Sequence, residues 1–147
     1  MRVSGQFEIQ NPDYIQVVQA SFARQGLLRH INAVLVSVEP GVVTIELPIT
    51  EEVSQQHGFV HAGAVTSIVD SACGYAALTL MPPDSKVLSV EFKINFLRPA
   101  AGVKLIAEGQ VLKPGRTITV CRGEVYALDE AGMQALCAVM QATMIRK

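Results

Sequence analysis

The chain lacks tryptophan, has few charged residues and contains no run of basic side chains. Its 147 residues include 12 Lys and Arg against 13 Asp and Glu, which gives a formal net charge of −1. The basic residues are scattered along the chain, so the electrostatic footprint of a DNA- or RNA-binding protein is missing. We therefore expect no nucleic-acid partner.

Cysteine is scarce as well. Cys73, Cys121 and Cys137 form no CxxC pair and lie in apolar stretches. An odd number of such thiols is typical of buried, reduced cysteines and excludes a disulfide framework. The first residues show neither the apolar stretch nor the small-residue cleavage site of a secretory signal. These features predict a cytoplasmic protein.

Apolar residues are abundant. They make up 50% of the chain, while charged residues make up 17%, compared with about 25% in a typical soluble domain. The length predicts a single domain over residues 1–147. A monomer of this size could not hide so much apolar surface, so we expect a homodimer or a homotetramer.

Turn signals and hydrophobic periodicity predict the order of the elements. The tripeptide at 11–13 predicts the start of an amphipathic helix that reaches residue 26. Two β-branched runs flank the turn at 39–41 and predict a hairpin. Further strands are expected over 88–96, 103–112, 116–128 and 133–145, the last as one strand or two. The short turns between them imply antiparallel pairing. The alternating pattern of 88–96 predicts that one face of that strand is covered.

The segment 62–80 is predicted to be a helix that is apolar or small on nearly every side. Such a helix is buried. A membrane span is disfavoured because Asp70 would lie at its middle, where a charge is costly. A carboxylate in apolar surroundings also costs several kcal/mol unless it has a partner or a use, so Asp70 needs an explanation.

The stretch QQHGFVHAG at 55–63, followed by Asp70, carries a family resemblance. Its amide residue, glycine, histidine and helical carboxylate have the spacing of the hotdog-fold acyl-CoA thioesterases, and the chain resembles their phenylacetate-degradation (PaaI-like) branch. The segments SVEFKINFLRPA and LKPGRT resemble two further blocks of that branch. The resemblance implies an α+β hotdog fold, an antiparallel sheet wrapped round a central helix, and hydrolysis of an acyl-CoA thioester without a cofactor.

Thioester hydrolysis needs a carboxylate that attacks or activates water, together with donors for the developing oxyanion. Asp70 is expected to be that nucleophile or general base. A carboxylate merely satisfied by Thr66, Ser71 or a buried hydrogen bond is the alternative. The first free backbone N–H of the helix, at Ala62, is expected to polarise the carbonyl. Family members usually have glycine there, but alanine preserves a main-chain donor.

The resemblance assigns further residues to the site. Gln55 occupies the family's amide position, and Ser89 matches a serine that in some relatives helps hold water near the carboxylate. A surface-loop glutamine and an exposed strand serine are the alternatives. His61 is expected to fix the loop at the helix N-terminus or to border the thioester. Because His57 and His61 are only two histidines without a nearby third ligand, we expect no metal.

Coenzyme A carries phosphates, so basic side chains near loop ends are expected to bind it. Solvated turns are the alternative for each of them. The depth of the acyl pocket is expected to depend on Phe59, Tyr75, Leu78 and the N-terminal helix. The residues expected to contact substrate or coenzyme A are Arg98, Lys113, Gly115 and Arg116 in the family blocks, and Gly58 and Gly63 in the loop.

One geometric difficulty predicts a shared site. Asp70 lies eight residues beyond Ala62, a rise of about 12 Å along one helix, so the two groups cannot readily meet at one carbonyl carbon. Two helices packed antiparallel about a two-fold axis would bring them together, and hotdog thioesterases are known for such sites. Two alternatives stay open: a hotdog-fold hydratase or dehydratase that uses His57 or His61, and a non-catalytic acyl-CoA-binding domain.

Overall fold

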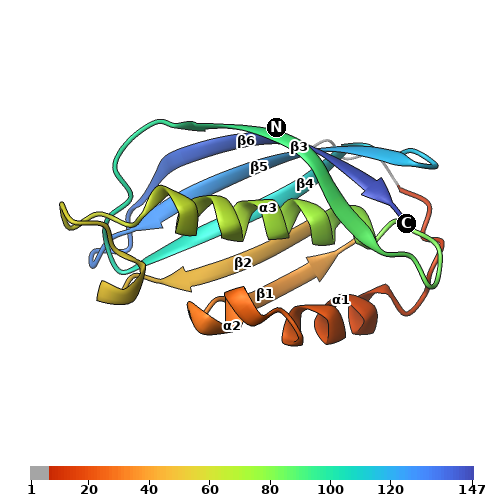
Figure 1. The fold of residues 1–147 in the computed structure, drawn as a ribbon, viewed down its shortest axis with the longest axis horizontal. Helices are drawn as coiled ribbons and strands as arrows, with labels where there is room; N and C mark the ends of the chain where they lie inside the picture. Colours follow the sequence, from red (N-terminus) through yellow and green to blue (C-terminus); the bar gives the residue numbers. More distant parts are fainter. Residues whose placement is uncertain (1–6) are drawn as a thin grey trace.

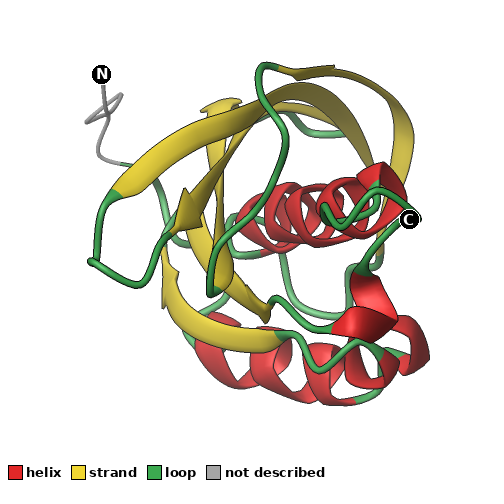
Figure 2. Ribbon diagram, turned by 90° about the vertical axis from the view of Figure 1, so that its left-hand side faces the viewer, coloured by secondary structure: helices red, strands yellow, loops and turns green. Residues whose placement is uncertain are grey.

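The computed structural model describes residues 7–147. A six-stranded antiparallel sheet with the order β1-β2-β4-β5-β6-β3 curves round one long helix, α3 (Figures 1 and 2). The predicted hotdog architecture is confirmed. The elements are α1 (Tyr14–Ala23), α2 (Gly26–His30), β1 (Val34–Glu39), β2 (Val42–Pro48), the 3₁₀ turn η1 (Glu51–Val53), α3 (Ala62–Leu78), β3 (Val87–Phe96), β4 (Lys104–Lys113), β5 (Ile118–Leu128) and β6 (Gln134–Arg146).

The middle of the sheet lets α3 approach closely because two glycines face the helix. Gly109 of β4 pairs with Gly123 of β5. A Cβ at Gly109 would overlap the backbone of Ala72, and one at Gly123 would overlap a methyl group of Val69. Any larger side chain would push the helix away from the sheet. This glycine pair therefore sets the depth of α3 and of Asp70 with it.

Only one side of α3 is buried by this chain. Its apolar side chains pack with those on the concave face of the sheet into one core. The opposite side faces solvent fully or in part, so the expectation of a helix buried all round is wrong for the single chain. Small side chains and Asp70 form that open side, which comprises Ala62, Gly63, Ala64, Thr66, Ser67, Asp70, Ser71 and Gly74.

The N-terminal segment forms two helices where one was predicted. The side chain of Asn11 accepts a hydrogen bond from the backbone N–H of Asp13 (3.0 Å) and shapes the turn before α1. However, α1 ends at Ala23, and Gly26 begins α2 instead of ending the first helix. Five residues are too few to show a helical period in the sequence. Burial of Leu28 in the core anchors this short helix.

Strand β3 forms one edge of the sheet and pairs only with β6. Its apolar side chains were expected to be covered, but of that predicted face only Ile94 is half-buried against the core within this chain. Leu88 and Val90 are each 54% exposed, Phe92 is 41% exposed and Phe96 is 48% exposed. A long apolar edge strand is usually covered, because it otherwise invites pairing with another chain. Within residues 7–147, no helix has the length and hydropathy needed to cross a membrane.

Candidate active site

The loop before α3 is closed by its own backbone. The N–H of His61 donates to the carbonyl of Val53 (2.8 Å), and the N–H of Gln55 donates to the carbonyl of Phe59 (2.8 Å). Between them, Gly58 has a φ of +86°, which favours glycine. A Cβ on Gly58 would meet open space. Glycine is therefore favoured there by the positive φ and not by crowding. The closed loop holds Gln55 beside the start of α3.

His61 caps the N-terminus of α3. Its Nδ1 accepts a hydrogen bond from the N–H of Gly63 (2.7 Å). A Cβ on Gly63 would stand 2.9 Å from that nitrogen, so glycine leaves room for the ring. Ala62 is the first residue of the helix and has no positive φ. In the described part of the chain its N–H has no hydrogen-bond partner, so it remains free to donate.

Gln55 offers a second donor near Ala62. The N–H of His57 donates to Gln55 Oε1, which fixes the amide and leaves its Nε2 hydrogens available. Gln55 and Ala62 line one groove with a volume of about 610 Å³, together with Arg98 and Phe96. The groove is therefore lined by two residues with N–H groups that can donate to a ligand oxygen, Gln55 through its side chain and Ala62 through its main chain.

A β-bulge turns Ser89 toward α3. Ser89 pairs with Met144 and Glu91 pairs with Thr143, so Val90 is an extra residue on β3. The extra residue reverses the alternation of side chains on its two sides. Without it Ser89 would lie on the face away from the helix. In this position its hydroxyl donates to Asp70 Oδ1 at 2.7 Å.

Asp70 is half-buried and has one hydrogen-bond partner, Ser89, among the described residues. The hydroxyl of Thr66 donates to the carbonyl of Ala62 (2.8 Å) and not to the carboxylate. Ser71 lines the same cavity as Asp70, but no hydrogen bond joins them within residues 7–147. Thr66 and Ser71 therefore do not satisfy the carboxylate; within residues 7–147 Ser89 is its partner, and the second carboxylate oxygen remains open.

The predicted catalytic residues lie in two separate places. Asp70 and Ser89 line a cavity of about 270 Å³, whereas Gln55, His61 and Ala62 line the larger groove at the helix N-terminus. About two turns of helix separate the two groups. One chain alone does not bring the carboxylate to the N–H donors.

The basic residues expected to bind coenzyme A are also divided. Arg98 lines the groove that contains Gln55. Gly115 and Arg116 line a third cavity, of about 410 Å³, near the C-terminal end of α3. Lys113 is exposed at the end of β4 and lines none of the three cavities described above.

Gly115 has a structural reason that is independent of any ligand. A Cβ on Gly115 would overlap the carbonyl oxygen of Ile118, so the tight turn between β4 and β5 requires glycine. An open backbone for a ligand is not needed to explain it.

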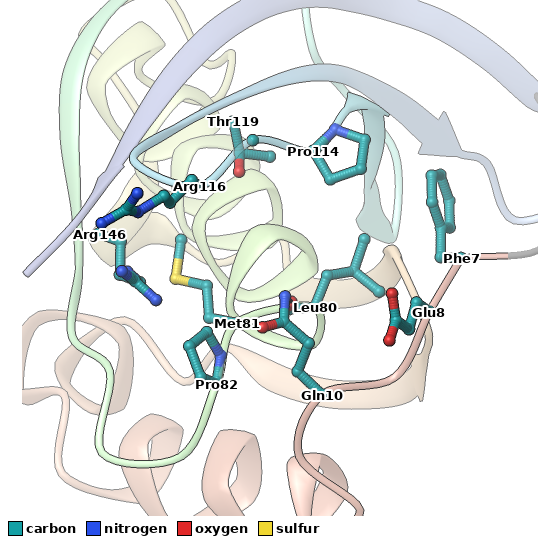
Figure 3. Close-up of a pocket in the computed structure, with 11 residues that line it drawn as sticks. Phe7, Glu8, Gln10, Leu80, Met81, Pro82, Pro114, Arg116, Thr119 and Arg146 are labelled. Atoms are coloured by element: carbon teal, nitrogen blue, oxygen red, sulfur yellow. Dashed lines mark hydrogen bonds between the residues drawn. The ribbon is translucent and has the colours of Figure 1, made fainter.

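The third cavity contains an arginine that the sequence did not reveal. Figure 3 shows Arg116 and Arg146 together on one side of it, with Gln10 and Glu8 opposite. Neither guanidinium forms an ion pair within residues 7–147. Arg146 is the last residue of β6, and only the sheet order brings it beside the turn that carries Arg116.

The residues expected to set pocket depth are scattered too. Phe59 lines the groove beside Gln55, and Tyr75 lines the cavity beside Asp70. Leu78 is buried and lines none of the three cavities.

Two of the three thiols, those of Cys73 and Cys121, are unsuited to nucleophilic catalysis. Burial raises the pKa of Cys121 to about 12 and raises the pKa of Cys73 well above its usual value. Both therefore stay protonated at neutral pH, and a thiol is a poor nucleophile. No group of three or more potential metal ligands occurs within residues 7–147.

Comparison with known proteins places the chain in a family. Residues 57–133 match the thioesterase superfamily. A thioesterase family protein from Silicibacter pomeroyi has 44% identity and a TM-score of 0.88, covering 90% of this chain and 97% of its own. The chain belongs to the thioesterase superfamily. The predicted resemblance is thus confirmed, and thioester hydrolysis is the general activity that membership gives this chain.

Two further relatives of this thioesterase are informative. A 1,4-dihydroxy-2-naphthoyl-CoA hydrolase from Listeria monocytogenes is 27% identical, over 83% of this chain and 96% of its own. The PaaI protein of the Escherichia coli phenylacetic acid degradation operon has the same fold. Its TM-score is 0.80 at 19% identity, over 95% of this chain and 96% of that one.

Proposed function

We propose that the chain hydrolyses an acyl-CoA or aryl-CoA thioester to the free acid and coenzyme A, at a site that two copies share. One observation carries the proposal: the carboxylate and the N–H donors line different cavities of a single chain. The Listeria relative, whose name is that of an acyl-CoA hydrolase, supports coenzyme A as the thiol.

A second copy of the chain would cover the exposed edge of the sheet at β3. The apolar side chains of β3 and the small-residue side of α3 lie open to solvent next to each other. Both surfaces would be buried if two copies met about a two-fold axis. The helices would then run antiparallel, with Asp70 of one copy near the N-terminus of the other helix. Each dimer would hold two sites, and a tetramer would hold four.

In such a site the carboxylate activates water or attacks the thioester, and the N–H donors stabilise the oxyanion. Asp70 takes a proton from water while the water oxygen attacks the carbonyl carbon, or it attacks that carbon itself and water cleaves the resulting anhydride. Ser89 holds the carboxylate in place. Gln55 Nε2 and the Ala62 N–H stabilise the oxyanion until the C–S bond breaks and the coenzyme A sulfur is protonated.

The rival activities have less support. A hydratase would need an imidazole at the site that is free to move protons, but His61 Nδ1 already accepts the hydrogen bond of the helix cap, and His57 lines none of the three cavities described above. The Silicibacter relative is named a thioesterase family protein, and the Listeria relative is named a CoA-thioester hydrolase. A non-catalytic acyl-CoA-binding domain would keep the cavities and show no turnover. The cytoplasmic location stays a prediction from the sequence.

The direct test is release of free thiol from a panel of acyl-CoA and aryl-CoA thioesters. We expect steady release from at least one member. Crotonyl-CoA serves as the control, because a hydratase would remove its enoyl absorbance without releasing thiol. Thiol release from none of the panel, with binding retained, would favour the non-catalytic domain.

Substitution of Gln55 tests the oxyanion donors. Gln55→Ala should lower kcat on the order of 10-fold to 10³-fold, because the main-chain donor of Ala62 remains. The matched control is Gln141→Ala, since Gln141 is exposed on β6 and lines none of the three cavities. If KM alone rises, Gln55 binds the substrate and does not stabilise the transition state.

The arginines near the turn test the coenzyme A contacts. Arg116→Ala and Arg146→Ala should each raise KM for acyl-CoA several-fold and leave kcat largely unchanged, and added salt should raise KM in the wild type. Thioesters of N-acetylcysteamine lack the phosphates and should show neither effect. Arg24→Ala, at an exposed position after α1, is the control. Equal losses with both kinds of thioester would contradict a phosphate contact.

A further inference from the structure

The hydroxyl of Ser89 lies within reach of two acceptors. Its oxygen is 2.7 Å from Asp70 Oδ1 and 3.4 Å from the sulfur of Met144. A serine hydroxyl carries one hydrogen, so it donates fully to only one of them at a time. While Asp70 is ionised, the carboxylate is the better acceptor, because a hydrogen bond to a charged group is stronger than one to a neutral group. The sulfur is then a second acceptor that the hydroxyl does not use.

The fold fixes the sulfur beside Ser89. Met144 is a residue of β6 and pairs with Ser89 across the antiparallel ladder, next to the bulge in β3. Its side chain is fully buried and lines the cavity that contains Asp70. A buried side chain in a closely packed core has little freedom to move. The bulge that turns Ser89 toward α3 therefore also leaves its hydroxyl next to the sulfur.

Thioester hydrolysis removes the charge that makes Asp70 the stronger acceptor. If Asp70 takes a proton from water it becomes a neutral acid, and if it attacks the carbonyl carbon it becomes part of a neutral anhydride. In both cases the hydrogen bond from Ser89 loses its charge assistance. An interaction that is stronger in the ground state than in the transition state slows the reaction. An acceptor whose strength does not depend on Asp70 compensates for part of this loss.

We propose that Met144 is a positioning residue whose sulfur accepts the hydrogen of the Ser89 hydroxyl as the charge on Asp70 disappears. The inference rests on the proposed thioester hydrolysis and adds a residue that acts through Ser89. The sulfur favours the neutral form of the Asp70 carboxyl group, whereas the donated hydrogen bond from Ser89 favours the ionised form. Two neighbouring side chains thus have opposite effects on one carboxyl group, and a side chain that only fills space would have neither.

Few other titratable groups face Asp70. Within residues 7–147, no second carboxylate, histidine, lysine or arginine lines its cavity. On the same helix, burial raises the pKa of the Cys73 thiol well above its usual value, so this thiol stays neutral. The hydroxyl of Tyr75 is hydrogen-bonded to Gln25 (2.8 Å) and to Ser21 (3.2 Å), which are themselves uncharged.

The second copy of the proposed dimer would add two further groups. They are the imidazole of its own His61 and the guanidinium of its own Arg98, which line the groove at the N-terminus of α3. A change at Met144 leaves both of them in place. A difference between the pH profiles of the wild type and a Met144 variant therefore reports on the carboxyl group of Asp70.

The test removes the sulfur and keeps the volume of the side chain. In Met144→Leu we expect the acid limb of the pH profile of kcat/KM to move to lower pH by about 0.3 to 1 unit, because the neutral carboxyl group loses its support. We expect kcat to fall about 2-fold to 10-fold with little change in KM. Ser89→Ala should move the acid limb the opposite way, to higher pH, because the ionised form loses a donor. Initial rates of thiol release against pH measure both shifts.

A second methionine on the same strand provides the matched control. Met140 is 2% exposed and lines none of the three cavities described above. Met140→Leu should leave both the pH profile and kcat unchanged. In a chain that already carries Ser89→Ala, Met144→Leu should cause no further movement of the acid limb, because the sulfur acts through the hydroxyl. If Met144→Leu is poorly folded by circular dichroism, replacement of all methionines by norleucine removes the sulfur without changing the shape, with and without Ser89→Ala.

The NMR chemical shift of the Asp70 carboxyl carbon gives a readout that needs no turnover. Comparison with Asp70→Asn assigns the signal, and its protonation midpoint should move with the kinetic acid limb. An unmoved midpoint without the sulfur overturns the inference, while the proposed function stands if the wild type releases thiol. A shift that persists when Ser89 is replaced by alanine indicates a packing effect and also overturns it. If the wild type releases no thiol, the proposed function fails, and the NMR midpoints still decide whether the sulfur acts through Ser89.

Discussion

Asp70→Asn is expected to lower kcat by at least about 10²-fold without unfolding the protein. Asparagine has nearly the shape of aspartate, and its amide oxygen can still accept the hydrogen bond from Ser89. It cannot take a proton from water or attack a thioester as a carboxylate does. Steady-state thiol release and thermal unfolding of the two proteins measure the effect on catalysis and on stability separately.

A matched change controls for the loss of a charge. Asp84→Asn removes a carboxylate from the exposed loop after α3, where the φ of +62° is one that asparagine tolerates. This variant should keep wild-type kcat. If Asp70→Asn also turns over like the wild type, Asp70 has no part in the mechanism. A wild type that binds thioesters but releases no thiol would make the chain a binding domain.

The sequence predicted the fold well because its signals are local. Alternating segments and short turns predicted the antiparallel strands, and the steps of three and four predicted α3. The glycine pair Gly109 and Gly123 was not predictable in this way, because their pairing depends on the register of two strands. That pair decides how close the helix lies to the sheet. Local patterns predict which elements form, while long-range register decides their spacing.

The candidate site shows the same limit. The motif at 55–63 drew attention to Gln55, His61 and Ala62, which share one groove. Strict alternation placed Ser89 on the wrong side of β3, and only the bulge at Val90 turns it toward Asp70. The contacts of Tyr75 with Ser21 and Gln25 join residues 50 or more positions apart, so no sequence window contains them.

Most apolar side chains of β3 are exposed, although the alternating pattern predicted that they would be covered. Alternation of apolar and polar residues indicates that one face will be covered, but it does not say by which chain. Within the single chain the α3-facing residues Phe92 and Phe96 stay exposed, as do Leu88 and Val90. A cover supplied by a second copy would satisfy the pattern. The same cover would bring a second helix N-terminus to Asp70.

Mixing two damaged chains is expected to restore activity. A chain with Asp70→Asn keeps an intact Gln55 and Ala62, and a chain with Gln55→Ala keeps an intact Asp70 and Ser89. If each site takes one group from each subunit, a heterodimer of the two contains one undamaged site and one doubly damaged site. Random reassociation makes half of the dimers mixed, so activity should reach about one quarter of the wild-type value. Thiol release from the refolded equimolar mixture measures it.

The control for this experiment uses two lesions on the same side of the site. Asp70→Asn and Ser89→Ala both damage the carboxylate half, so every site in their heterodimer carries one lesion. That mixture should show only the mean activity of its parents, whatever the residual activity of each. A tag on one chain, followed by affinity capture and mass measurement, establishes that heterodimers have formed. If captured heterodimers of Asp70→Asn with Gln55→Ala also stay at the mean of their parents, the carboxylate and the donors must act within one chain. The separation of about 12 Å along α3 would then have to close by movement of the helix or the loop, because an undistorted helix cannot bring Asp70 to its own N-terminus.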